Sequence, residues 1–305
     1  MSAELLLGLT LRRGRSDDIG DVTQLIVAEE SSLRGRSEWG TTDTEDWWRT
    51  LEDLGEAWVV EAADGGVVAM VGLVHRNERY DCWLAVSPEH KGSELDEQLV
   101  AHAEQRAKAL GGSVLQFGSL AEDTVLQELL ERSGYSAVRH FFRMRIDFAE
   151  PPTEPIWPDG IMCTTFDRED ARAFHGAVSE SFAENWDFLP MEFEAWKRLR
   201  LGAPDFDPTL WFVARERQTI AGIIRCDAER WGGGWVALLG VRKAWRRQGI
   251  GLALLLQAFG EFFRRGQRTV GLGVDAQNPT GATRLYERAG MRVESEDIVY
   301  GKDLA

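Results

Sequence analysis

The chain has 305 residues, of which 44% are hydrophobic, and its 50 acidic against 35 basic side chains give a net charge of −15. This acidic balance argues against nucleic-acid binding, which depends on cations that neutralise phosphates. Apolar runs stay shorter than the roughly 18 residues of a membrane span, and the start MSAELLLGLTLRRGR lacks a signal-peptide layout. Three cysteines without a CxxC pair predict neither a disulfide framework nor a zinc site, so we expect a cytoplasmic protein.

The first half predicts strands and helices in turn. A short strand is expected at 9–13, a helix beginning at Asp17–Asp18, and a strand pair within 57–75. A strand at 82–88 then runs into a long helix, and another strand, a helix ending in glycine and a last strand follow. This order predicts a central sheet with helices on its faces.

The second half repeats the order after EPPTEPIWP (150–158), which holds four of the nine prolines. A strand is expected at 161–166 and then a helix, a strand pair within 210–227, and a strand at 235–242 that leads into a helix. We therefore predict an α/β (α+β) chain of two tandem domains, each a mixed central sheet flanked by helices. Their bounds are 1–150 and 159–305, with a linker at 151–158.

A register comparison supports a duplication. Aligning Lys91 with Arg246 gives an offset of 155, and aligning Gly134 with Gly290 gives 156, so the two halves differ by one residue over this stretch. A self-similar period of this kind indicates a repeated structural unit.

The stretch VRKAWRRQGIG (241–251) begins the helix that follows the strand at 235–242. A helix N-terminus is the positive end of the helix dipole, so Arg246 and Arg247 are out of place there unless an anion lies between. Glycines at 249 and 251 would let that anion approach the backbone N–H groups. The stretch therefore predicts a phosphate-binding turn.

This turn, followed by Asn278, Tyr286 and Gly290 in VDAQNPTGATRLYERAGM (274–291), resembles the GNAT N-acetyltransferase superfamily. The resemblance covers the second half and, in degraded form, the first. It implies acetyl-CoA as co-substrate, no metal, and a small-molecule amine as acceptor. The residues that it places at the coenzyme are Leu239, Gly240, Val241, Arg246, Arg247, Gln248, Gly249, Ile250, Gly251 and Asn278.

The resemblance also assigns chemical roles. A backbone N–H around Leu239–Val241 would polarise the acetyl carbonyl, and Tyr286 would be the general acid for the departing sulfur. Tyr286 could instead be a core residue of its helix. Asn278 could be an N-cap with proline at the first helical position.

The general base stays open, because the positions of the central strand expected to face inward, Trp235, Ala237 and Leu239, hold no carboxylate. Candidate bases elsewhere are Asp227, Glu229, Glu180, Glu184, Asp187 and Glu192. An acceptor pocket is expected where SFAENWDFLPMEFEAW (181–196) meets the sheet, since its aromatic and acidic residues could hold a cationic or sugar-like amine. The alternative is that these aromatics form the core of two amphipathic helices.

The first half lacks the residues of the motif. At the positions matching Gly249, Gly251, Tyr286 and Asn278 it holds Glu94, Asp96, Leu130 and Glu122. Carboxylates at a helix N-terminus suit a bare dipole and repel a phosphate. We therefore expect a non-catalytic first domain.

Taken together, these features predict an acetyl-CoA-dependent N-acetyltransferase that acts on a primary amine of a small molecule, with the C-terminal domain active. The tandem layout is also similar to the mycothiol synthase branch of the superfamily, which acetylates a cysteinyl amine. A non-enzymatic acyl-CoA-binding or protein-interaction module is the third possibility. We expect a monomer or homodimer that binds neither nucleic acid nor a membrane.

Overall fold

The computed structural model describes residues 3–4, 8–76, 79–186, 188–203 and 205–304. The chain divides into two compact units: unit 1 is Met1–His140 with Ser295–Ala305, and unit 2 is Phe141–Glu294. In the described part of the chain, no helix is long and apolar enough to cross a membrane.

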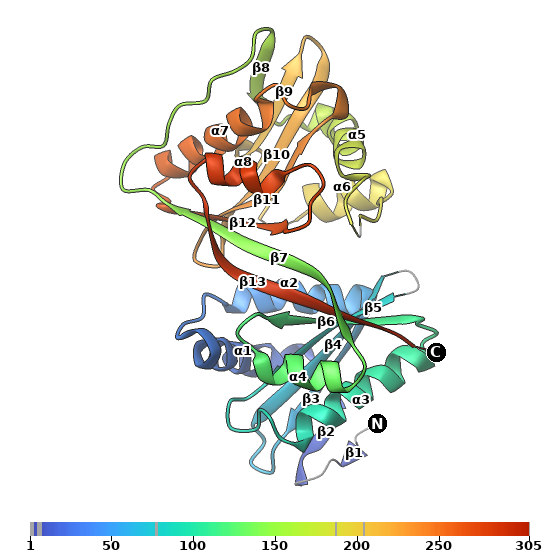
Figure 1. The fold of residues 1–305 in the computed structure, drawn as a ribbon. Helices are drawn as coiled ribbons and strands as arrows, with labels where there is room; N and C mark the ends of the chain where they lie inside the picture. The colour runs from blue at the N-terminus through green and yellow to red at the C-terminus, as the bar shows by residue number, and fades with distance from the viewer. Residues whose placement is uncertain (1–2, 5–7, 77–78, 187, 204, 305) are drawn as a thin grey trace. The chain divides into compact units, whose positions relative to one another are not determined.

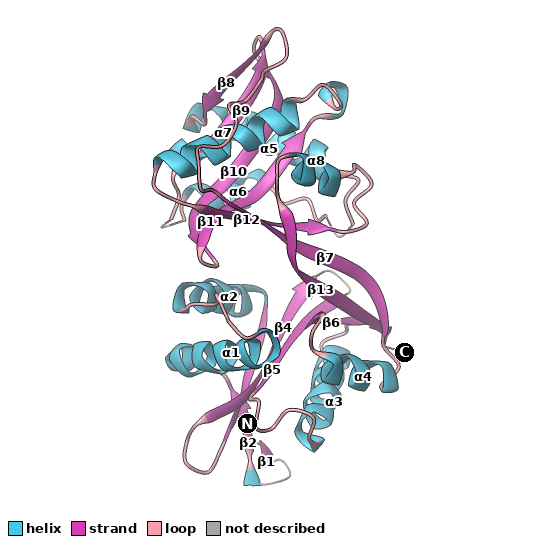
Figure 2. Ribbon diagram, turned by 60° about the vertical axis from the view of Figure 1, so that its left-hand side comes forward, coloured by secondary structure: helices cyan, strands magenta, loops and turns pink. Residues whose placement is uncertain are grey.

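Unit 1 is a sheet with helices on both faces. Along the sheet the order is β1-β2-β3-β4-β5-β6-β13. The α1 and α2 helices lie on one face, and α3 and α4 on the other (Figure 2). Its strands are β1 (Ala3–Glu4), β2 (Thr10–Arg13), β3 (Gly55–Glu61), β4 (Val67–Arg76), β5 (Arg79–Val86) and β6 (Val114–Leu120), with part of β13 (Arg292–Asp303). Its helices are α1 (Ile19–Arg34), α2 (Thr41–Leu54), α3 (Glu94–Ala109) and α4 (Thr124–Arg132).

Unit 2 repeats the arrangement in the order β7-β12-β11-β10-β9-β8 (Figure 1). Its strands are β8 (Ile161–Thr165), β9 (Trp211–Glu216), β10 (Thr219–Arg230), β11 (Gly233–Val241) and β12 (Thr269–Asp275), with part of β7 (Ser136–Asp147). Its helices are α5 (Ala171–Phe182), α6 (Phe193–Leu201), α7 (Ile250–Arg264) and α8 (Ala282–Arg288). The predicted mixed α/β fold with two repeats is confirmed.

The closing strands are exchanged between the two halves of the sequence. Residues 141–147 of β7 pair antiparallel with β12, and residues 297–303 of β13 pair antiparallel with β6. The expected division at the proline-rich segment 151–158 differs from this one, because that segment joins β7 to β8 inside unit 2. The chain passes between the units within β7 and within β13 instead.

The α5 and α7 helices cover opposite faces of the unit 2 sheet. A Cβ on Gly234 would meet the Phe262 ring of α7 at 2.5 Å, whereas a Cβ on Gly240 would meet Ser181 of α5 at 2.9 Å. An even spacing of six residues would put both glycines on one face of β11. Arg225 and Cys226 of β10 pair with Leu238 and Val236, so Ala237 is an extra residue in β11, and this bulge reverses the alternation.

This bulge corrects the expected inward positions. Beyond it, Gly240 faces α5, and by alternation Leu238 faces α5 as well, whereas Leu239 does not. Neither Leu238 nor Gly240 carries a carboxylate, so this strand still provides no candidate for the general base.

Candidate active site

The parallel pairing of β11 with β12 runs only from Gly234 to Val236. Beyond Val236 the described residues give β11 no partner on its β12 side, although pairing with β10 continues to Val241. The backbone around Leu239–Val241 therefore borders an opening in the sheet. A strand edge of this kind presents N–H groups that can donate hydrogen bonds to the carbonyl oxygen of a ligand.

The turn after β11 ends at Gly249, which is the N-cap of α7 with φ 91°. Apart from Gly249 itself and its two chain neighbours, no atom of the described residues lies within 4 Å of the place where its Cβ would stand, so the space there is open. Arg247 also has a left-handed backbone, with φ 64°. Such backbone turns direct successive N–H groups into one concavity.

The N-terminus of α7 retains its hydrogen-bonding capacity. The first backbone bond of the helix runs from the Ala253 N–H to the Gly249 carbonyl at 3.0 Å. Among the described residues, the N–H groups of 247–252 donate to no acceptor. Ile250 is buried and anchors the turn. Unpaired donors at the positive end of a 15-residue helix fit a pyrophosphate.

Arg246 does not point freely toward this anion site. Its Nε donates to the Val241 carbonyl at 3.1 Å, its Nη2 to the Ser181 carbonyl at 3.1 Å, and its Nη1 to Glu184 at 2.9 Å. Glu184 also pairs with Lys243 at 3.0 Å, and hydrogen bonds from the two cations lower the Glu184 pKa. Arg246 therefore ties the turn to α5.

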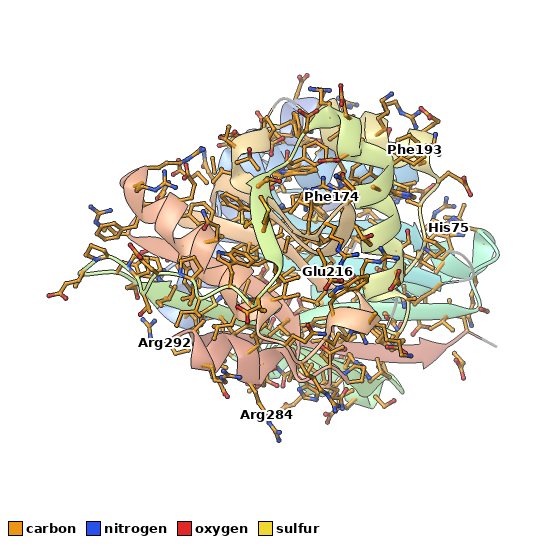
Figure 3. The ribbon with its side chains drawn as sticks, turned by 90° about the horizontal axis from the view of Figure 1, so that it is seen from above. His75, Phe174, Phe193, Glu216, Arg284 and Arg292 are labelled. Carbon is orange, nitrogen blue, oxygen red and sulfur yellow. The ribbon has the colours of Figure 1, made fainter. Side chains whose placement is uncertain are left out.

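Two exposed cations remain near the turn. In the described part of the chain, neither Arg247 nor Arg284 has a hydrogen-bond or ion-pair partner, and Figure 3 shows Arg284 projecting outward from α8. A Cβ on Gly251 would lie 3.3 Å from the Leu285 side chain, so the residue after Arg284 packs against the first turn of α7. Sequence reasoning missed Arg284, because only this packing brings it near the turn. Gln248 donates to the Ala244 carbonyl at 3.3 Å.

The corresponding helix start in unit 1 is satisfied internally. The Asp96 carboxylate accepts from the Gly92 N–H at 2.5 Å, and the Ser93 hydroxyl oxygen accepts from the Leu95 N–H at 3.3 Å. Asp96 is buried. Its carboxylate occupies the N-terminus of α3 as an anion would.

A buried ion cluster seals the same helix start. The Lys91 ammonium pairs with Glu29 and lies 2.5 Å from the Asp123 carboxylate. The Lys91 side chain is 12% exposed, and both carboxylates are less so. Burial is the largest cause of the raised pKa of Glu29 and of Asp96. Unit 1, which lacks the equivalents of Gly249 and Gly251, thus has buried charged side chains at the α3 start.

Tyr286 lies on α8 and is 8% exposed. Burial raises its pKa to about 12, so the phenol is protonated at neutral pH. Its hydroxyl has no hydrogen-bond partner among the described residues. The sequence left open a core role or a general acid, and Tyr286 packs in the core cluster while it keeps this donor.

Asn278 does not cap α8, because the N-cap is Gly281. The alternative reading of Asn278 as a helix cap is therefore wrong. Its side-chain oxygen accepts from the Thr280 N–H at 2.9 Å and from the Thr280 hydroxyl at 2.6 Å, closing the turn before the helix. The amide nitrogen has no partner in the described part of the chain.

The aromatic residues of 181–196 are largely core residues. Trp196 is buried, and Phe182 and Phe188 pack against the same core. Trp186 lies 5.9 Å from Phe141, ring centroid to ring centroid. Phe174 beneath them sits inside the unit, whereas Phe193 lies near its edge (Figure 3).

Of the candidate bases, Glu180 accepts from Arg242 at 2.7 Å, and Glu184 is held by two cations. Asp227 lies 3.7 Å from Arg225. Glu192 is the N-cap of α6, and Glu229 is exposed. Asp187 lies outside the described residues. Among the described residues, no group of three His, Cys, Asp or Glu side chains could hold a metal ion.

The model of the acetyltransferase (GNAT) family matches residues 22–135 and 171–291, one match in each half. The chain belongs to the GNAT acetyltransferase family. It is an N-acetyltransferase of a family that uses acetyl-CoA. A crystal structure of a GCN5-related N-acetyltransferase from Sphaerobacter thermophilus is 33% identical, covers 97% of this chain and 96% of that one, and superposes with a TM-score of 0.83.

Relatives found by sequence are named more specifically, as mycothiol acetyltransferases. The mycothiol acetyltransferase of Thermobispora bispora is 29% identical over 67% of this chain and 74% of the relative. That of Clavibacter michiganensis subsp. michiganensis is 26% identical over 95% and 94%. A tandem GNAT protein from the clavulanic acid biosynthesis pathway is 15% identical, covers 97% of this chain and 99% of that one, and has a TM-score of 0.76, which shows a common fold.

Proposed function

We propose that this N-acetyltransferase transfers acetyl from acetyl-CoA to a primary amine of a small molecule, and that only unit 2 is active. The observation that supports this most is the contrast between two equivalent helix starts. The α7 start has an open glycine and unpaired N–H groups. The α3 start is occupied by the carboxylate of Asp96. We place the reaction in the cytoplasm, because three free cysteines suit a reducing compartment.

Each part of unit 2 has a role in this proposal. Gly249, Ile250 and Gly251 present N–H groups to the pyrophosphate. Arg247 and Arg284 supply charge from the rim, with Asn278 as a further polar contact. Arg246 holds the turn in place rather than binding the phosphate directly.

The opened edge of β11 supplies the electrophilic contact. An N–H of Leu239, Gly240 or Val241 would donate to the acetyl oxygen, where negative charge develops as the amine attacks. Gly240 brings α5 close to β11 at this point, because a larger side chain would collide with Ser181. The neutral amine attacks from the α5 side.

Tyr286 would act on the leaving sulfur. A thiol has an ordinary pKa near 8.5, so a phenol at about 12 cannot hand over its proton completely without cost. It can donate a hydrogen bond that stabilises negative charge on sulfur as the bond breaks. We therefore expect a contribution to turnover and little contribution to coenzyme affinity.

The test is thiol release from acetyl-CoA in the presence of a panel of primary amines. We expect amine-dependent release by the wild-type chain and strongly reduced release by a Gly249→Glu variant at the same acetyl-CoA concentration. A panel that contains a cysteinyl amine acceptor addresses the second candidate, the acetylation that the names of the relatives suggest. Coenzyme binding without amine-dependent release would overturn the proposal.

A further inference from the structure

Arg225 of β10 is a poorly partnered cation on the α5 and α6 face of unit 2. Its guanidinium carbon lies 5.8 Å from the ring centroid of Trp211, whose ring in turn contacts Phe174 of α5 and Trp196 of α6. Its side chain is only 18% exposed. In the described part of the chain its guanidinium makes no hydrogen bond. A guanidinium carries five donors and normally satisfies them when it loses solvent.

Other charged side chains lie around Arg225. Asp227 is the nearest carboxylate, at 3.7 Å, which is too long for a hydrogen bond. Arg200 and Arg230 belong to the same neighbourhood, with Asp205 as a second carboxylate. Burial and repulsion from Arg225 lower the pKa of Arg200 to about 10. Arg225 and Arg200 thus repel each other.

The hairpin between β10 and β11 adds further donors. Trp231 has a left-handed backbone, with φ 48°, and its ring lies 4.3 Å from that of Trp235. Arg230 and Arg143 lie 4.4 Å and 4.5 Å from the Trp231 ring centroid. The buried indole N–H of Trp231 has no acceptor among the described residues. The hairpin thus adds an indole donor beside two cations.

This donor-rich surface adjoins the expected reaction centre. Arg225 pairs directly with Leu238 across the β10–β11 ladder, and Leu238 precedes the strand edge proposed to bind the acetyl oxygen. Directly opposed residues of an antiparallel pair have Cα atoms about 4.5–5.5 Å apart. An Arg225 side chain can therefore reach a group attached close to an amine that attacks there.

Building on the proposed function, we infer that the acceptor is a primary amine that also carries an oxyanion, a carboxylate or a phosphate, and that Arg225 binds this group. A guanidinium matches either group with two parallel hydrogen bonds. Arg200, which repels Arg225, makes the potential favourable for it. The sequence alone suggested a cationic or sugar-like amine, and this surface points to an anionic one.

Matched pairs of amines test the inference. One pair is L-phenylalanine and phenethylamine, which differ by the carboxylate, and another is phosphoethanolamine and ethanolamine, which differ by the phosphate. We expect kcat/KM at least tenfold higher for the anionic member of one pair, and the preferred pair distinguishes carboxylate from phosphate. Arg225→Gln should remove this preference by raising KM for the anionic amine, and Arg225→Lys should keep part of it.

Two further readouts separate this inference from the proposed function. Acetyl-CoA affinity should be the same for wild type and Arg225→Gln, which also shows that the variant folds. Direct calorimetric titration with each amine, without acetyl-CoA, should show binding of an anionic member that Arg225→Gln weakens. Equal or better binding and turnover of both neutral members would overturn the inference. Failure of the wild type to bind acetyl-CoA would overturn the proposed function instead.

Discussion

Replacing Gly249 by glutamate tests the phosphate-binding turn, and the glutamine variant at the same position is its matched control. Gly249 has φ 91°, so either side chain costs about 1–2 kcal/mol of backbone strain. Apart from Gly249 and its chain neighbours, no atom of the described residues lies within 4 Å of the added Cβ, so the Cβ of neither variant meets a steric clash. The two variants therefore differ mainly in one negative charge at the α7 N-terminus.

The size of the charge effect follows from Coulomb's law. A carboxylate about 5 Å from one phosphate charge is repelled by about 1 kcal/mol in water and about 3 kcal/mol at an effective dielectric constant of 20. Since about 1.4 kcal/mol corresponds to a factor of ten, Gly249→Glu should bind acetyl-CoA about 5- to 150-fold more weakly than Gly249→Gln. The gap should shrink at high salt, because the turn is exposed.

Calorimetric titration of both variants with acetyl-CoA measures this gap, and thermal unfolding shows whether they are equally strained. The mirror change in unit 1, Glu94→Gly, should create no second site, because Asp96 still fills the α3 start. Equal affinities of the glutamate and glutamine variants would refute the reasoning, since no anion would then lie at the turn.

Three other variants address separate parts of the account. Tyr286→Phe should lower turnover at least several-fold with coenzyme affinity unchanged, and an unchanged rate would remove Tyr286 as the acid. Because the pKa of Tyr286 is about 12, ionisation of this phenol should cause no loss of wild-type activity below about pH 11. Lys91→Met leaves buried carboxylates without their cation and should cost about 3–5 kcal/mol in urea unfolding, a loss that an exposed pair would not show. Gly240→Ala places a Cβ 2.9 Å from Ser181 and should destabilise by about 1–3 kcal/mol, whereas Gly260→Ala, which meets no atom within 4 Å, should not; equal unfolding midpoints would contradict the packing.

The parts of the fold that depend on local pattern were predictable. The strands and helices that were given places lie within a few residues of them, because apolar periodicity and glycine stops are local signals. The α2 helix (Thr41–Leu54) was not among them. The turn at 246–251 was visible for the same reason. Its glycines answer a requirement of the local backbone, as the φ of Gly249 shows.

Features that depend on distant partners were not predictable. The exchange of β7 and β13 depends on which strand each one meets, and both have the same apolar pattern whichever partner they take. Two contacts of Arg246, with Ser181 on α5 and with Glu184 just after it, lie more than 60 residues earlier in the chain. One extra residue at position 237 reversed the faces of β11, and a bulge leaves no mark in a pattern of period two.

The most direct measurement is a calorimetric titration of the intact chain with acetyl-CoA, read for stoichiometry. The account predicts one site per chain, abolished or strongly weakened by Gly249→Glu and unaffected by Asp96→Asn. Two sites, or one site that survives Gly249→Glu and disappears with Asp96→Asn, would contradict the assignment of an active unit 2 and a filled unit 1.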